Sequence, residues 1–317
     1  MSSTFARAGR RAALPALLGA LAALLAGCGA GAGSAPSQTR LTVTQDFGSR
    51  AQRDLAAPKV SGSETVMRLL QRNAKITTRF GGGFVQSIDG VAGGRRDGRP
   101  FDWFYYVNGV EASEGAAAVR LHPGDRVWWD RHDWGAAMRV PAVVGSFPEP
   151  FVHGFDGHRL PVRVECADPS TTACDEVFKT LGALGVPAAK GGLRTAQTEQ
   201  TLRVVVGPWI AARDELALRP LESGPARSGV YARPAPDGRS IRALDARGRA
   251  TRTLGPGTGL VAAAREGDEP PVWAVTGTDG AGVDAAARAF TERTLGRRFA
   301  VAVVGGRAVP LPEAPAS

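Results

Sequence analysis

Two short aromatic segments constrain the fold of this chain more than any other feature. Residues 103–107 (WFYYV) end at the turn signal Asn108-Gly109, and residues 126–130 (RVWWD) follow a Pro-Gly-Asp turn. Aromatic runs bounded by such residues predict β-strands. The elements predicted for residues 41–135 are a strand, a helix and then several strands. We therefore expect an α+β fold that begins with a small sheet and one helix packed against it.

The aromatic residues of the first segment alternate between the two faces of the predicted strand. Trp103 and Tyr105 share one face, and Phe104 and Tyr106 share the other. A single small sheet with one helix can bury only one of its faces, so the second aromatic set must meet solvent, a ligand or the rest of the chain. Exposed aromatic clusters mark contact sites. The sequence leaves open whether this face binds a ligand or packs against residues 136–317.

The helix of the first domain is predicted at residues 61–70 (SGSETVMRLL). Val66, Leu69 and Leu70 recur at helical spacing and therefore form one apolar face. Ser63 is the predicted N-cap, because a serine hydroxyl can accept a hydrogen bond from a free amide of the first turn.

An export signal precedes this domain. Residues 1–27 contain three arginines and no acidic residue, and an apolar run follows at residues 12–26. This run is too short and too rich in alanine and glycine to predict a membrane-spanning helix. It ends in LAGC at Cys28, which resembles the lipobox of bacterial lipoproteins. We expect cleavage before Cys28, lipid on its thiol, attachment to the outer face of the cell membrane, and a flexible tether at residues 28–40. An ordinary signal peptide with a coincidental cysteine and a twin-arginine signal are the alternatives.

Cysteine usage agrees with an oxidising compartment. The chain has three cysteines, and lipid on Cys28 leaves Cys166 and Cys174 on either side of a turn-forming stretch. We expect these two residues to form a disulfide. A shared metal ion is the alternative, but no histidine or further cysteine is close to them in the sequence.

Residues 136–317 alternate between predicted strands and helices, which indicates a mixed α/β layer domain. Strands are expected at residues 162–166, 202–206, 229–232, 240–244, 272–276 and 299–304. Helices are expected at residues 174–184, 209–218 and 283–295. The glycine-rich turn at residues 277–282 could bind an anion at a helix N-terminus. It lacks the Lys-Ser/Thr of a phosphate-binding loop, so we predict that Thr278 or Asp279 caps the helix instead.

Four motifs of the first domain form a specific pattern: SGSETVMRLL, FVQSIDGV, DWFYYVNGV and LHPGDRVWW. Together they resemble the transcobalamin C-terminal-like domain of bacterial surface proteins, across about 95 residues (41–135). In vertebrate transcobalamin and intrinsic factor the related domain closes over cobalamin, and some bacterial members occur on lipoproteins associated with uptake. The resemblance implies a β-grasp-like fold and a ligand-binding face, but not cobalamin specifically. Motifs such as VVGPW and SGVYAR are similar to the companion region of actinobacterial lipoproteins.

Several function classes are not expected. The formal net charge is +9, but the basic residues are scattered among acids in runs of at most two, which argues against nucleic-acid binding. The chain has no Gly-x-Ser-x-Gly motif, no His-Glu-x-x-His motif and no spare cysteine nucleophile. We therefore expect no enzyme activity, no resident metal and no cofactor.

These features together predict a lipid-anchored extracytoplasmic protein that binds a small molecule. A cobalamin-like nutrient is one candidate ligand, and a membrane uptake transporter is the expected partner. The predicted ligand contacts are Trp103, Tyr105, Asn108, Trp128, Trp129 and His132. His132 could also ligate a metal, although a lone histidine in a charged loop is more often a hydrogen-bonding surface residue. The main alternative is a structural or partner-binding envelope lipoprotein, and a hydrolase of unfamiliar type is the second alternative.

Overall fold

The two aromatic segments are neighbouring strands of one sheet in the computed structural model, which describes residues 37–154, 157–193 and 200–314. The strands of this sheet are β1 (Arg40–Gln45), β2 (Arg50–Leu55), β6 (Gly94–Arg96), β7 (Arg99–Val107), β8 (Val110–Glu111) and β9 (Arg126–Asp133). Their order is β2-β1-β9-β7-β6, with β8 paired to β7. Strand β1 runs parallel to β9, and the other neighbouring strands are antiparallel. The expected α+β class is thereby confirmed in this broad sense.

The turn at Asn108-Gly109 joins β7 to β8, as expected. Asn108 has φ 54° and Gly109 has φ 82°, so both residues lie in the left-handed region that a tight hairpin turn requires. A Cβ atom on Gly109 would also lie 2.8 Å from the carbonyl oxygen of Val143. Glycine is therefore needed here both for its backbone conformation and for space.

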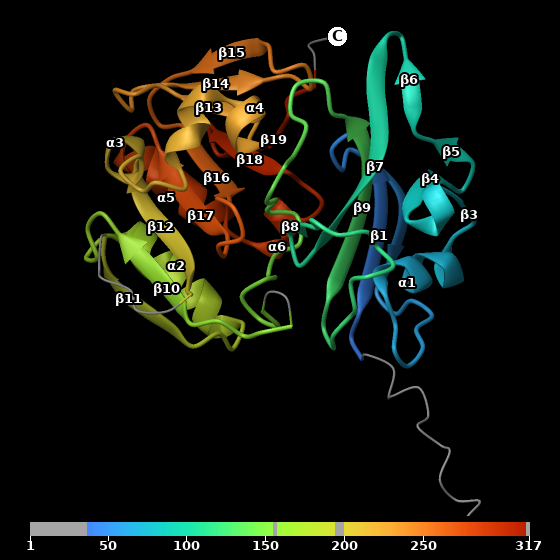
Figure 1. Cartoon of the computed structure of the whole chain (residues 1–317). Coiled ribbons are helices and arrows are strands. Elements are labelled where there is room, and N and C mark those ends of the chain that lie inside the picture. Colours follow the sequence, from blue (N-terminus) through green and yellow to red (C-terminus); the bar gives the residue numbers. More distant parts are fainter. Residues whose placement is uncertain (1–36, 155–156, 194–199, 315–317) are drawn as a thin grey trace, which may run out of the picture. The chain divides into compact units, whose positions relative to one another are not determined.

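Helix α1 (Val66–Asn73) packs on one face of this sheet, beside β1 (Figure 1). The predicted N-cap is wrong: Thr65, not Ser63, caps the helix and accepts a hydrogen bond from the amide of Arg68 at 3.3 Å. Ser63 has a positive φ of 53°, so the chain is still turning at that residue, whereas Thr65 is extended. A second, three-stranded sheet follows α1, with a 3₁₀ turn between its first two strands. Its elements are β3 (Ile76–Arg79), η1 (Phe80–Gly82), β4 (Phe84–Ile88) and β5 (Val91–Ala92).

The pairing of β7 with β9 assigns the aromatic side chains to the two faces of the sheet. Tyr105 lies opposite Trp129, and Tyr106 lies opposite Trp128. Tyr105 and Trp129 belong to the core cluster that contains the buried side of α1, together with Trp103. This cluster is the core of the first domain.

The opposite face of the sheet packs against the second half of the chain. The ring of Phe299 lies 5.2 Å from that of Trp128 and 5.7 Å from that of Tyr106. Phe47, in the β1–β2 turn, contacts both Phe299 and Tyr231 with ring centroids 5.0 Å apart. The sequence left open whether this face binds a ligand or packs against residues 136–317, and the packing is confirmed.

The second half is built on a seven-stranded sheet of order β11-β10-β12-β17-β16-β18-β19. Its strands are β10 (Val162–Cys166), β11 (Ala188–Gly192), β12 (Leu202–Pro208), β16 (Gly259–Ala264), β17 (Val272–Gly277), β18 (Ala300–Val304) and β19 (Arg307–Leu311). The strands from β11 to β17 in this order are parallel, and the remaining pairs are antiparallel. The strands expected at residues 162–166, 202–206, 272–276 and 299–304 are therefore present, with ends that differ by up to two residues.

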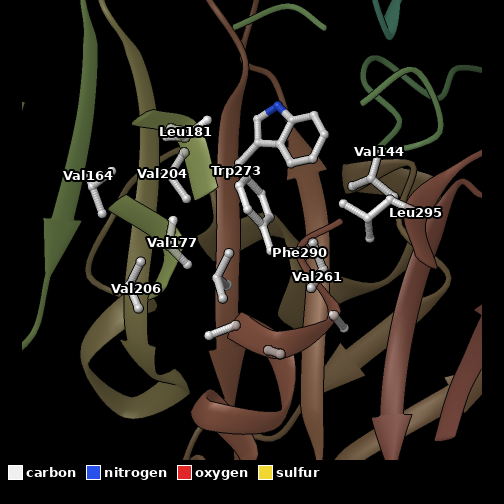
Figure 2. Packing of buried hydrophobic residues seen from close by; sticks show 14 of the residues in the cluster. Val144, Val164, Val177, Leu181, Val204, Val206, Val261, Trp273, Phe290 and Leu295 are labelled. Carbon is white, nitrogen blue, oxygen red and sulfur yellow. The ribbon is translucent and has the colours of Figure 1, made fainter. Parts of the chain in front are cut away.

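Helices α2 (Thr172–Ala183) and α5 (Gly280–Ala289) bury their apolar sides in one core cluster with this sheet. Figure 2 shows Val177 and Leu181 of α2 beside Val204 and Val206 of β12. Asp279 caps α5 through a hydrogen bond from the amide of Gly282 at 2.8 Å, as predicted.

Two predicted helices are wrong in length. The helix expected at residues 283–295 is two helices, α5 and α6 (Glu292–Leu295). The break occurs where the fully buried Phe290 packs against Trp273 and Phe147, and Thr291 then caps the second helix. The helix expected at residues 209–218 is only α3 (Trp209–Ala212). There the chain folds back, so that Glu222 accepts hydrogen bonds from the side chains of Trp209 and Arg213.

The hairpin predicted around residues 229–244 is part of a three-stranded sheet. Its strands are β13 (Ala232–Pro234), β14 (Ile241–Leu244) and β15 (Ala250–Leu254), and short helical turns η2 (Arg219–Ser223) and α4 (Pro225–Ser228) precede it. The expected strand at residues 229–232 is wrong, because Gly229 has φ 72° and ends α4 as a left-handed cap.

The expected disulfide between Cys166 and Cys174 is present. It joins the end of β10 to the first turn of α2, and both cysteines are fully buried. Of the helices in the described ranges, none is long and apolar enough to cross a membrane.

Removing the disulfide should lower the free energy of unfolding by about 2–3 kcal/mol, because the cross-link closes a loop of roughly nine residues in the unfolded chain. The measurement is urea unfolding of the protein with and without a reducing agent, and of the Cys166→Ala/Cys174→Ala variant. The reducing agent should have no further effect on the variant. Equal midpoints for the oxidised and reduced protein would contradict the prediction.

Candidate functional site

A cavity opens beside β7, mainly on the face of the first sheet that carries Trp103, and Asp102 and Phe104 of the opposite face also line it. Its volume is about 350 Å³, and its walls come from β4, β7, β9, the segment 111–116 after β7, and the chain beyond β9. Six aromatic residues line it: Phe84, Trp103, Phe104, Tyr105, Trp129 and Trp134. Helix α1 and the three-stranded sheet cover the rest of this face.

The aromatic wall of the cavity is held by hydrogen bonds and stacking. The rings of Tyr105 and Trp129 stack with centroids 4.9 Å apart. Trp103 donates its indole N–H to the carbonyl of Val91 at 3.0 Å, and the Tyr105 hydroxyl donates to the carbonyl of Glu114 at 2.6 Å. Burial raises the pKa of the Tyr105 hydroxyl, so this group remains a neutral donor.

Trp129 differs from the other tryptophans of the wall. Its side chain is 2% exposed, and its indole Nε1 has no hydrogen-bond partner among the described residues. A buried donor without a partner costs free energy. Trp129 also lines the cavity, but its Nε1 atom is itself buried, so an acceptor oxygen on a bound molecule reaches this donor only when the indole shifts toward the cavity.

Three carboxylates add negative charge to the cavity: Asp102, Glu111 and Glu114. Asp102 accepts a hydrogen bond from the indole of Trp134 at 2.9 Å, and desolvation raises the pKa of its carboxyl. Glu111 accepts a hydrogen bond from the amide of Val140 at 2.8 Å, and desolvation likewise raises its pKa. The cavity therefore combines aromatic surface with partly desolvated acids.

Two large apolar side chains at the rim face solvent. Met138 lines the cavity and is 72% exposed. Phe80, in the turn before β4, is 86% exposed, and its ring lies 6.2 Å from that of Phe84. The rim is thus an apolar surface that extends the cavity outward.

The structure brings three of the six predicted ligand contacts together in the cavity wall, namely Trp103, Tyr105 and Trp129. It places the other three elsewhere. Trp128 lies on the opposite face of the sheet, where its indole donates to the hydroxyl of Thr44 at 2.7 Å. Trp128 does not line the cavity and belongs to the core cluster on that opposite face.

His132 and Asn108 do not line the cavity and have structural partners. His132 is 2% exposed, stacks on Phe104 with ring centroids 4.5 Å apart, and hydrogen-bonds Asp130 at 2.9 Å. It is therefore a buried residue rather than the surface residue that the sequence favoured. Asn108 donates to the carboxylate of Asp125 at 2.8 Å and accepts from the amide of Arg126 at 2.9 Å, so it stabilises the two turns. In the described parts of the chain, no group of three or more potential ligands could hold a metal ion. Cys28 lies outside the described residues.

Sequence reasoning missed several residues of the cavity. Phe84 is the first residue of the motif FVQSIDGV, in which a strand was predicted. This motif could have indicated Phe84 as a candidate cavity residue. Asp102 lies one residue before the first aromatic segment, and Trp134 lies four residues after the second. Both therefore fall outside the strands that the sequence predicted. No sequence pattern indicated Met138 as a cavity residue, because its position depends on the path of the chain after β9.

A buried carboxylate fixes the β1–β2 turn on the opposite face of the sheet. Asp130 is fully buried and accepts hydrogen bonds from the amides of Phe47 at 3.0 Å and Gly48 at 2.9 Å. The hydroxyl of Thr44 and the ring of His132 also bond this carboxylate. These bonds place Phe47 in contact with Phe299 and Tyr231.

The comparisons with known proteins cover part of the first domain. Residues 63–133 match the family described as a domain of unknown function (DUF4430). The match includes most of the cavity wall but less than half of the chain. No curated protein and no solved structure matches this chain.

Asp130→Asn should lower the free energy of unfolding by about 2–4 kcal/mol, because the amide nitrogen cannot accept and at least one buried donor loses its partner. Urea unfolding followed by circular dichroism measures this loss. Asp97→Asn is the matched control, since the Asp97 side chain is 89% exposed. A midpoint for Asp130→Asn equal to that of the control would show that the network does not stabilise the fold.

Proposed function

We propose that this protein is a lipid-anchored extracytoplasmic binding protein that captures a small molecule in the cavity beside β7. The bound molecule then passes to a membrane uptake transporter. The observation that carries the proposal is the aromatic wall with its buried, unpartnered Trp129 indole. Small-molecule sites typically have volumes of roughly 300–1,000 Å³ and combine apolar walls with a few polar groups. The cavity, at about 350 Å³, lies at the lower end of this range.

We also propose that residues 41–135 are a β-grasp-like domain related to the transcobalamin C-terminal-like domain. The support is the order of the elements: the β1–β2 hairpin, then α1, then later strands, with β1 parallel to β9. The motifs that carry the resemblance include five of the six aromatic residues in the cavity wall. A cobalamin-like nutrient is accordingly one ligand candidate, held at one end by this cavity.

Attachment to the membrane is the second part of the proposal. Its support is the LAGC motif that ends at Cys28, after a basic segment and an apolar run. Lipid on Cys28 would keep the binding domain at the membrane surface, where a transporter could receive the ligand. The disulfide between Cys166 and Cys174 fits an oxidising compartment.

Ligand binding is tested by isothermal titration calorimetry of the full-length mature protein in detergent micelles, with cobalamins and smaller ring-bearing nutrients. At least one compound should bind. Trp129→Phe should weaken its binding about tenfold, because the ligand loses the indole donor.

Trp128→Phe is the matched control for this experiment, since it changes the neighbouring indole on the opposite face of the sheet. Its affinity for the ligand should equal that of the wild type. The proposal fails if no compound of the panel binds and native mass spectrometry detects no small molecule that copurifies with the protein. It also fails if both variants weaken binding equally.

A partner-binding envelope lipoprotein is the second candidate function. The exposed side chains of Phe80 and Met138 at the rim favour it, because a protein could cover them. Cross-linking in intact cells, followed by affinity purification, distinguishes the two. A stable partner that is lost in Phe80→Ser/Met138→Ser, with no bound small molecule, would favour this candidate.

The anchor has a separate test. Cys28→Ser should abolish incorporation of a labelled fatty acid and move the protein from the membrane fraction to the extracytoplasmic soluble fraction, because no thiol remains to carry lipid. Cys166→Ala/Cys174→Ala should remain labelled. Intact-mass analysis of the wild type should give a chain that begins at Cys28, and an unmodified chain with residues upstream of Cys28 would disprove the anchor.

A further inference from the structure

The cavity wall differs in charge from the chain as a whole. The full sequence has 39 basic and 30 acidic residues. Yet the lining residues include Asp102, Glu111 and Glu114 and no arginine, lysine or histidine. This excess of negative charge lies directly beside aromatic surface, and the two features together select for the charge of a ligand.

Asp102 is a partly buried carboxylate of the cavity wall. Its carboxylate receives a hydrogen bond from a neutral donor, the indole of Trp134. It forms no ion pair within the described part of the chain, and Arg131 and Arg79 act on it only at longer range. Desolvation is the largest influence on its pKa, which is raised. A positive group in the cavity would lower the pKa of the Asp102 carboxyl again, because it favours the charged form.

Of the other two carboxylates, only Glu111 has an ion-pair partner among the described residues. Arg139 lies 3.8 Å from Glu111, and the Arg139 side chain is itself 56% exposed. Glu114 is exposed, and its backbone carbonyl rather than its carboxylate receives the Tyr105 hydroxyl. An anion in the cavity would therefore meet three carboxylates and no cation of the wall, whereas a cation would gain from all three.

The aromatic residues add a second attraction for positive charge. The faces of Trp, Tyr and Phe rings attract ammonium groups, and tryptophan does so most strongly. Three tryptophans, Trp103, Trp129 and Trp134, line this cavity. The unpartnered indole N–H of Trp129, which is buried beside the cavity, adds one requirement once a small shift of the indole uncovers it, namely an acceptor oxygen on the same ligand.

We propose that the cavity selects a small organic cation, an alkylated ammonium group on an apolar frame that also carries an acceptor oxygen. This inference rests on the proposed binding function and names the chemical class of its ligand. The ammonium group lies against the indole faces near Asp102, and the oxygen accepts from Trp129.

The test uses three probes of one shape and different charge: choline, its neutral isostere 3,3-dimethylbutan-1-ol, and the anion 3,3-dimethylbutanoate. Each is titrated into the full-length mature protein and followed by calorimetry at low ionic strength. Choline should bind about tenfold more tightly than the neutral alcohol, because only choline gains the ion–carboxylate and cation–π attraction. The anion should not bind.

Asp102→Asn should reduce the affinity for choline about five- to tenfold and leave the affinity for the neutral alcohol unchanged. The amide oxygen can still accept from Trp134, so the wall keeps its geometry, and unchanged binding of the alcohol reports that it does. Asp97→Asn is the charge-matched control, because Asp97 is exposed and does not line this cavity. It should bind all three probes as the wild type does.

Equal affinity for choline and the neutral alcohol would overturn the inference and leave the proposed binding function standing. Tighter binding of the anion than of choline, or no binding of choline at millimolar concentration, would also overturn it. In that case, binding of an uncharged nutrient in the calorimetric panel would still support the proposed function. Failure of both sets of ligands would overturn both.

Discussion

The antiparallel register between β7 and β9 is the constraint on which the rest of this structure depends. It sets Tyr105 opposite Trp129 and Tyr106 opposite Trp128, so each pair of large rings lies on its own face of the sheet. A shift by one residue would exchange the two faces. The ring contacts with Phe299 and the aromatic wall of the cavity would then be lost together.

The two faces have different degrees of coverage, and this difference produces the cavity. On one face, Phe47 and Phe299 pack closely against Tyr106 and Trp128, and the buried Asp130 fixes the turn that carries Phe47. On the other face, α1 and the three-stranded sheet cover only part of the surface. The remaining part borders the cavity, where Phe84 and Trp134 are partly exposed and Trp103, Tyr105 and Trp129 are largely buried.

Local signals predicted much of this fold. Strand β10, the Asn108-Gly109 turn, the Asp279 cap and the disulfide all follow from residues close together in the sequence. The break after α5 could not be predicted, because helical periodicity continues through Phe290, whereas Phe290 packs against Phe147 and Trp273, which are distant in the sequence. The cavity was predictable in part: strand alternation gives Trp103 and Tyr105 a common face. Met138 reaches it by tertiary packing alone.

The position of β1 has a mechanical consequence. β1 follows directly on the first described residues and lies between β2 and β9, with hydrogen bonds on both sides. A pull on the amino-terminal end along this strand stretches both rows of hydrogen bonds in shear, so many bonds must fail at once. A force applied along β1 would therefore meet more resistance than a force on a strand at the sheet edge, which could peel away bond by bond.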